Sequence, residues 1–328
     1  MRYALLIVAA GMLFGTTGTA RALAPASASS LSIGAVRLVL GGLILGVVGL
    51  VRYVGGKRSG ASSPPMTRSG IAARALVVAV CGAAIAVYQA TFFEGTHLNG
   101  VMVGTILALG SSPLFAGALE WLVFRRRPGM VWLLSTAICI VGLVSLSSSR
   151  DTQVVTSARG VVDSLIAGLC YATLAVGSKW LLTKGHKSVD VAVATMTAGA
   201  VLTIVPMLRT DLGWLAEPRG IAVAVWLGIA TVVVAYLLNT AGLAHTSASA
   251  TTTLNLAEPA TASVLGVTVL GEQLTLLRLL GIACVVAGVV LLGTSSRRSP
   301  AEDDVGPAAV VPSRTITPVA RPDRSAAP

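Results

Sequence analysis

One pattern occurs twice in this chain, in two stretches that lie far apart. In each copy a proline begins an apolar run that reaches a loop thirteen residues later, and a glycine recurs at the same offset in the next apolar segment. A repeated pattern of this length predicts two structurally equivalent halves. The matching positions are Pro113 with Pro259, Arg126 with Glu272, and Gly142 with Gly288.

Long apolar segments occupy most of the chain. Charged residues make up only 11% of the 328 residues, whereas soluble domains carry ~25%. A helix needs ~20 apolar residues to cross a bilayer, and these segments do not alternate in polarity as transmembrane strands do. They predict ten spans at residues 3–20, 31–51, 75–93, 100–119, 130–149, 161–182, 191–208, 221–244, 248–270 and 276–292.

Each half of the chain holds five of these spans. Because five is odd, the second half must enter the membrane from the side opposite to the first. The predicted fold is therefore all-α and integral to the membrane, with ten transmembrane helices as two inverted five-helix repeats. We place the repeats at residues 3–149 and 160–294. Residues 295–328 are rich in Pro, Ser, Ala and charge and are predicted to form a disordered cytoplasmic tail.

The basic residues predict the orientation of the spans. Clusters of Lys and Arg lie in every second loop, as in the run Arg125–Arg127, whereas the alternate loops mix Arg with Asp and Glu. Cytoplasmic loops carry the excess of Lys and Arg. We therefore expect a multi-pass protein of the cell membrane with both termini in the cytoplasm.

The ninth span contains the ionisable residue with the strongest functional signal. An acid inside a bilayer is costly and requires a partner or a role. At helical spacing Thr251, Asn255 and Glu258 share one face, and Pro259 leaves a preceding carbonyl without its helical partner. This face predicts either a site that binds a substrate or a proton, or a structural glutamate paired with a basic group.

Other polar residues inside spans extend the candidate site. Arg37 either binds an anionic group, pairs with an acid, or extends to the membrane interface. Hydroxyls and amides within spans either line a cavity or join helices by hydrogen bonds; this group comprises Tyr88, Gln89, Thr91, Tyr171, Ser178, Tyr236 and Asn239. Of these, we assign Tyr88, Tyr236 and Asn239 to the site. Glu120 is expected to pair with the neighbouring Arg125–Arg127 cluster.

Several chemistries lack their motifs. The four cysteines and three histidines are scattered, so no metal site and no cofactor are predicted. A phosphate-binding GxxxxGK[ST] loop is absent from the sequence, which argues against an ATP-driven motor in this chain. No paired catalytic groups occur at matching depth, so an enzyme is not expected.

The second half carries the most specific resemblance to a known family. Residues 254–259 (Leu-Asn-Leu-Ala-Glu-Pro), residues 270–275 (Leu-Gly-Glu-Gln-Leu-Thr), Gly281 and Gly288 resemble the corresponding elements of EamA-type transporters of the drug/metabolite transporter superfamily. Arg37 and Lys179 resemble the family's basic residues in the second span and after the sixth. The first half departs from the pattern, because Arg126 stands where the family commonly has a glutamate.

The resemblance implies a secondary transporter, expected to export small metabolites such as amino acids or related compounds across the bacterial inner membrane by alternating access. The alternative is a non-transporting membrane receptor or scaffold that retains the transporter fold. The expected partners are a small-molecule substrate and the lipid bilayer, and no nucleic acid. Coupling to protons and assembly into a homodimer are left open.

Overall fold

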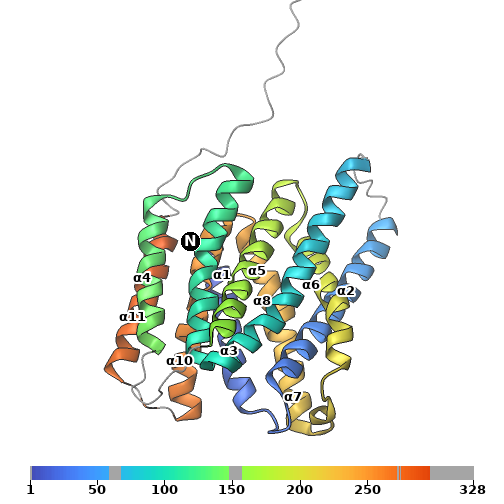
Figure 1. Ribbon diagram of the computed structural model, residues 1–328. Helices are drawn as coiled ribbons and strands as arrows, with labels where there is room; N and C mark the ends of the chain where they lie inside the picture. Colours follow the sequence, from blue (N-terminus) through green and yellow to red (C-terminus); the bar gives the residue numbers. More distant parts are fainter. Residues whose placement is uncertain (1, 59–67, 148–156, 272, 274, 296–328) are drawn as a thin grey trace, which may run out of the picture.

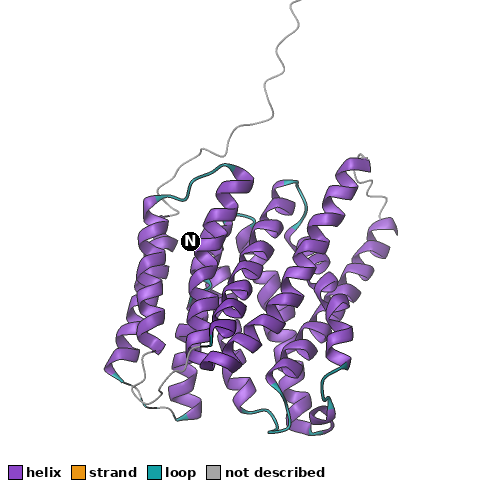
Figure 2. Cartoon of the chain, viewed as in Figure 1, coloured by secondary structure: helices purple, strands orange, loops and turns teal. Residues whose placement is uncertain are grey.

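The computed structural model describes residues 2–58, 68–147, 157–271, 273 and 275–295, and this part of the chain consists of helices joined by loops (Figure 2). The tail predicted at residues 295–328 lies outside the described residues apart from its first residue, and Glu272 lies outside them too. In the first half the helices are α1 (Arg2–Ala22), α2 (Ser30–Arg58), α3 (Arg68–Phe124) and α4 (Met130–Ser147).

The second half begins with two uninterrupted helices and continues with segmented ones. Its elements are α5 (Ala158–Thr183), α6 (Ser188–Leu208), the short 3₁₀ turn η1 (Gly213–Ala216), α7 (Pro218–Trp226), the π-helical stretch η2 (Leu227–Val234), α8 (Ala235–Leu243), α9 (Ala248–Leu254), α10 (Ala257–Leu270) and α11 (Leu276–Ser295).

Ten membrane crossings can be traced through the described residues. Eight segments are long and apolar enough to span a bilayer, and Met130–Leu146 is a shorter apolar helix. The broken pair α9 and α10 supplies the remaining crossing. The sequence-based prediction of ten spans is confirmed.

The third and fourth spans form a hairpin within α3. The chain reverses at Gly100, whose φ of 77° lies in the left-handed region that favours glycine. The reversal is tight: a Cβ placed on Gly104 would lie 2.7 Å from the Cα of Thr96. No separate loop is therefore needed between these two spans, as Figure 1 shows.

The ninth span is interrupted beside Glu258. Helix α9 ends at Leu254, α10 begins at Ala257, and Pro259 lies in the first turn of α10, where a missing N–H is tolerated. The sequence predicted that a carbonyl before this proline would be left free. It is not free, because the Asn255 carbonyl accepts the Glu258 N–H at 2.9 Å.

Helix α4, the last of the first half, packs against α11, the last of the second half. Two of the contacts between them correspond to each other under the sequence repeat. A Cβ on Gly142 of α4 would meet the Gly281 carbonyl and Val285 of α11, and one on Gly288 of α11 would meet the Ser135 carbonyl and Cys139 of α4. Under the repeat spacing Gly142 corresponds to Gly288, and Cys139 to Val285, so each contact maps onto the other. This exchange is consistent with two inverted halves.

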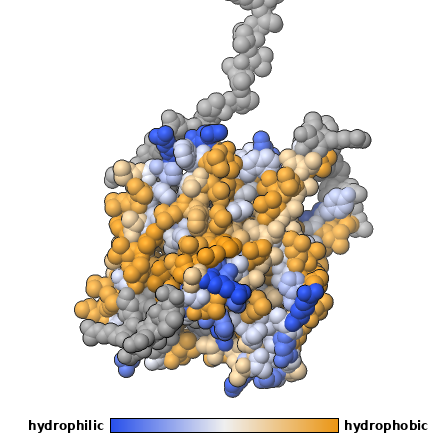
Figure 3. All heavy atoms as spheres, in the orientation of Figure 1, coloured by the Kyte–Doolittle hydropathy of each residue, from blue (hydrophilic) through white to orange (hydrophobic). Residues whose placement is uncertain are grey.

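The two ends of the bundle differ in their loops. In the orientation of Figure 1 the α3–α4 loop with Arg125–Arg127 and the α5–α6 turn lie at the upper end, while the α1–α2 and α6–α7 connections lie at the lower end. We call the upper end the basic face and the lower end the opposite face. Apolar side chains cover much of the flank between them (Figure 3). This distribution suits a protein surrounded by lipid.

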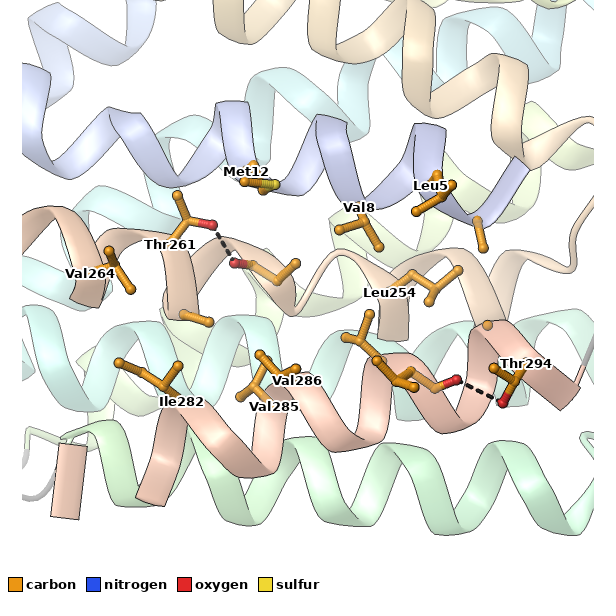
Figure 4. Close-up of a pocket in the computed structure, with 16 residues that line it drawn as sticks. Leu5, Val8, Met12, Leu254, Thr261, Val264, Ile282, Val285, Val286 and Thr294 are labelled. Atoms are coloured by element: carbon orange, nitrogen blue, oxygen red, sulfur yellow. Dashed lines mark hydrogen bonds between the residues drawn. The ribbon is translucent and has the colours of Figure 1, made fainter. Parts of the chain in front are cut away.

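One flank carries an apolar groove of about 390 Å³ between α1 and α11. Figure 4 shows Leu5, Val8 and Met12 extending into it from α1, opposite Ile282 and Val286 of α11. The groove backs onto α9 and α10, which separate it from the interior of the bundle. It faces the lipid side of the molecule and is not part of the site described below.

Candidate functional site

Polar side chains from both halves converge on a small recess inside the bundle, which we call the central recess. Its volume is about 20 Å³, room for about one water molecule. Ionisable groups this deep in a transmembrane bundle are rare and mark substrate or ion pathways. The side chains that line it are Phe14, Arg37, Leu38, Tyr88, Gln89, Tyr171, Thr231, Val232, Tyr236 and Glu258.

Arg37 enters the recess from α2 and is held by neutral groups. Its Nη1 donates to the Thr17 hydroxyl at 3.1 Å, and its Nη2 donates to the Gln89 amide oxygen at 3.2 Å. Its Nε is buried and has no hydrogen-bond partner. Among the described residues, no carboxylate lies within the 4.0 Å of an ion pair with Arg37. The guanidinium is therefore anchored but not neutralised by an ion pair.

Glu258 reaches the recess from the first turn of α10. The positive end of a helix dipole favours a carboxylate at this position. Within the part of the chain that the structure describes, the carboxylate makes no hydrogen bond and no ion pair, although it lies close enough to Arg37 for the two charges to interact. Two opposite charges thus line one recess without contacting each other.

Aromatic rings form much of the wall. Tyr88 of α3 lies 5.4 Å from Phe92 and 5.8 Å from Tyr171 of α5, measured between ring centroids. Phe14 of α1 meets Tyr236 of α8 edge to face at 5.2 Å. Packing of this kind fixes the orientation of the tyrosines around Arg37 and Glu258.

A larger cavity of about 400 Å³, which we call the access cavity, adjoins the recess and shares Phe14 and Glu258 with it. Its lining continues to Arg21, in the last turn of α1, and to Arg278, in the first turn of α11. Both of these helix ends lie at the opposite face. The carboxylate of Glu258 is therefore reached from the opposite face of the bundle.

Toward the basic face the recess is closed by an amide network. The Asn255 Nδ2 donates to the Tyr171 hydroxyl at 2.8 Å and to the Asn239 amide oxygen at 2.9 Å, so one side chain joins the α9–α10 break to α5 and α8. All three side chains are buried. Beyond them, the Thr136 and Thr253 hydroxyls hydrogen-bond at 2.9 Å and tie α4 to α9.

The connection between α8 and α9 is held at both ends by charged side chains. The Glu120 carboxylate accepts the Ala248 and Ser249 N–H groups at 3.0 Å each and caps α9. Lys179 Nζ donates to the Leu243 and Ala244 carbonyls at 3.1 and 3.3 Å at the end of α8. Both charges match the helix dipoles that they face. The described structure thus gives Glu120 a capping role instead of the expected pair with Arg125–Arg127.

The structure brings together four of the seven residues that the sequence predicted for the site. Arg37, Tyr88, Tyr236 and Glu258 line the recess, and Asn239 and Asn255 form the network on its basic-face side. Thr251 lies elsewhere: its hydroxyl bonds with Thr246 and with the Ser247 carbonyl, both at 2.9 Å, near the basic face. Shared helical phase did not bring it to the recess, because the break after Leu254 ends that helix.

Some lining residues carried no sequence signal that singled them out. Phe14, Thr17 and Thr231 resemble ordinary packing residues of a transmembrane helix. Gln89 and Tyr171 were candidates for either cavity lining or helix contacts, and in the structure they do both. Single hydroxyl and amide groups are common on transmembrane helices, where they often only join helices by hydrogen bonds. Their presence in the sequence therefore does not identify residues that line a cavity.

Comparison with known proteins agrees with this arrangement. The model of the EamA-like transporter family matches residues 1–148 and again residues 158–294. The chain is 36% identical to the uncharacterized transporter YwfM of Bacillus subtilis, over 90% of this chain and 95% of that protein. It is 27% identical to the threonine/homoserine exporter RhtA of Salmonella typhimurium, over 63% of this chain and 72% of that protein.

A solved crystal structure shares the fold, with a TM-score of 0.71 over 91% of this chain and 99% of that one, at 18% sequence identity. The family match covers both halves and nearly all of the described helices. This chain therefore belongs to the EamA-like transporter family and is a multi-pass membrane transporter by descent.

Proposed function

We propose that this protein is a secondary transporter that exports a small organic solute, an amino acid or a related compound, across the bacterial inner membrane by alternating access. The observation that carries the proposal is the unpaired Glu258 carboxylate at the inner end of the access cavity. A bare carboxylate in a transmembrane bundle is expensive to maintain. A receptor or scaffold that merely kept the fold would have no reason to retain it.

The position of the closure supports alternating access. The access cavity reaches the recess from the opposite face, and the Asn255 network separates the recess from the basic face. Taking the basic face as cytoplasmic, by the positive-inside tendency, this conformation is open to the outside. In alternating access, the Asn255 network would break and the access cavity would close, which makes the recess accessible from the cytoplasm.

The relatives support an amino acid as the class of solute and export as the direction of transport. The name of RhtA describes it as a threonine/homoserine exporter, and this chain aligns with it over most of that protein's length. We extend this to an amino acid or related compound as the solute here. Glu258 would take up a proton from outside when the solute leaves, so that inward proton movement drives export.

Flux measurements test the proposal. Purified protein in proteoliposomes is assayed with a panel of labelled amino acids that begins with threonine and homoserine, with and without a pH gradient. Glu258→Gln should abolish gradient-driven accumulation yet keep part of the solute exchange at saturating solute, because exchange requires no net proton movement. Glu217→Gln, on the exposed α6–α7 connection, is the matched control and should behave as the native protein does. Native gradient-driven transport by Glu258→Gln, or no flux for any solute of the panel, would refute the proposal.

A further inference from the structure

The guanidinium of Arg37 retains the donors that a carboxylate needs. Its two terminal nitrogens bond to Thr17 and Gln89, which are neutral, and the buried Nε–H has no partner. Each terminal nitrogen carries two N–H groups and donates to one neutral partner, so the Nε–H and one N–H on each terminal nitrogen remain, and guanidinium donors are arranged in planar forks. Such a fork matches the two oxygens of a carboxylate. An arginine with this pattern of satisfied and unsatisfied donors is prepared for an anionic ligand group.

Across the same recess, Glu258 offers the opposite charge. Its carboxylate has no partner among the described residues, and three tyrosines surround the recess. An ammonium group is recognised by a carboxylate together with aromatic faces. Arg37 belongs to the first half and Glu258 to the second, so a ligand that contacts both would bridge the two halves.

We propose that Arg37 and Glu258 bind the head group of an α-amino acid, with its carboxylate on Arg37 and its ammonium on Glu258; this inference rests on the proposed transport function. Separate unpaired charges of opposite sign call for a ligand that carries both charges on one small group. A zwitterion also keeps the site neutral overall in its lipid surroundings, which a lone anion or cation would not.

The dimensions of the two cavities define the rest of the ligand. In this conformation the recess of about 20 Å³ holds about one water molecule, so the side chains around it must move apart to admit the charged head group. The substituent on the α-carbon then extends past Phe14 and Glu258 into the access cavity of about 400 Å³. The lining of that cavity includes Phe92, Leu109, Leu143 and Leu146, with Thr105 among them, and it continues to Arg21 and Arg278. The ligand class is an amino acid with an uncharged side chain, apolar or hydroxylated.

Ligand-induced thermal stabilisation of the purified protein in lipid nanodiscs tests the assignment, because a ligand that binds the folded state raises its unfolding temperature. The probes are uncharged L-amino acids, including threonine, and for each one that stabilises, its N-acetyl and carboxamide derivatives. We expect the free amino acid to stabilise the protein and both derivatives to bind ~30-fold more weakly or worse, as expected for a buried charge that loses its partner.

Substitutions then assign each charge to its residue. Arg37→Gln should weaken binding of the free amino acid but leave binding of the carboxamide derivative unchanged. Glu258→Gln should weaken binding of the free amino acid but leave binding of the N-acetyl derivative unchanged. Arg209→Gln, an exposed arginine at the end of α6, is the charge control and should bind normally. Monodisperse protein with an unchanged unliganded melting temperature shows that each variant is folded.

Three results would overturn the assignment. Equal stabilisation by a free amino acid and its blocked derivatives would exclude two-point recognition of the head group. Loss of binding of all probes alike in both variants would make the two residues structural. Flux of an amine, a sugar or another non-zwitterionic solute without any response to amino acids would refute both the head-group assignment and the amino acid as the solute, while transport itself stands. Amino acid binding with the expected pattern but no flux would instead refute transport and leave the site intact.

Discussion

The carboxylate of Glu120 accepts a 2.5 Å hydrogen bond from the hydroxyl of Ser249 and thereby joins the end of α3, in the first half, to the start of α9, in the second. Together with the two backbone N–H groups that it also accepts, it satisfies the first turn of the broken span. Helix α8 carries Tyr236 and Asn239, and Asn255 directly follows α9, so this contact anchors the elements that close the recess.

Removal of the Glu120 carboxylate should therefore destabilise the protein. Glu120→Ala leaves two buried N–H groups and a hydroxyl without their acceptor, at a cost of about 1–3 kcal/mol. Glu120→Gln keeps one acceptor oxygen and should lose less. Thermal unfolding in detergent measures both. Glu94→Ala, at the surface of the same helix with its side chain 42% exposed, serves as the control. A melting temperature of Glu120→Ala equal to that of Glu94→Ala would contradict the capping role.

The amide of Asn255 should control access from the basic face. Asn255→Asp replaces the donor that bonds Tyr171 and Asn239 with an acceptor, so its contact with the Asn239 oxygen becomes repulsive. A cysteine at Ser263, which lines the access cavity, in a background without the four native cysteines, should react with an impermeant reagent applied from the opposite face only. Adding Asn255→Asp should make it reactive from the basic face too.

A matched amide change provides the control for this experiment. Asn99→Asp keeps the oxygen that accepts the Ser157 N–H at 2.7 Å, and it should leave the labelling pattern unchanged. Labelling of the Ser263 cysteine that does not respond to Asn255→Asp would show that the closure lies elsewhere.

Close packing between α1 and α10 should keep Glu258 in position. A Cβ on Gly15 would lie 2.6 Å from the Glu258 carbonyl and 2.7 Å from Thr261, so Gly15→Ala must displace α10. Gly11→Ala, one turn earlier, meets Ala257 and Asn255 at an ordinary 3.4 Å. We expect Gly15→Ala to lose most transport in proteoliposomes and Gly11→Ala to retain it. Equal activities of the two variants, at equal incorporation, would argue against this packing constraint.

The orientation of the bundle is open to direct test. Cysteines are placed at Arg126 on the basic face and at Leu23, which is 55% exposed on the opposite face. In intact cells an impermeant thiol reagent should modify the Leu23 cysteine and spare the Arg126 cysteine, because the basic loops are expected in the cytoplasm. Permeabilised cells should give both products. The reverse pattern in intact cells would invert the proposed topology and with it the side to which the access cavity opens.

The fold followed from sequence to a large extent, because membrane insertion is governed by local properties. Ten apolar segments of sufficient length required ten crossings, since unpaired backbone groups are not tolerated in lipid. An odd number of spans in each repeat required the inverted arrangement. The interruption beside Glu258 followed as well, because charge and proline within a span always need an explanation, and Arg37 became a candidate for the same reason.

What the tertiary structure alone decided was which side chains meet. Successive helical residues point ~100° apart, so a small rotation of a helix decides whether a polar group faces a cavity, a neighbour or lipid, and hydropathy does not specify that rotation. Glu120 was assigned to the nearby arginines by proximity in sequence, yet it caps α9 from 128 residues away. Thr251 was placed with Glu258 by helical phase, yet the break after Leu254 separates them. That Arg37 and Glu258 line one recess and remain unpaired depends on the packing of α2 against the second half, and no local pattern encodes that contact.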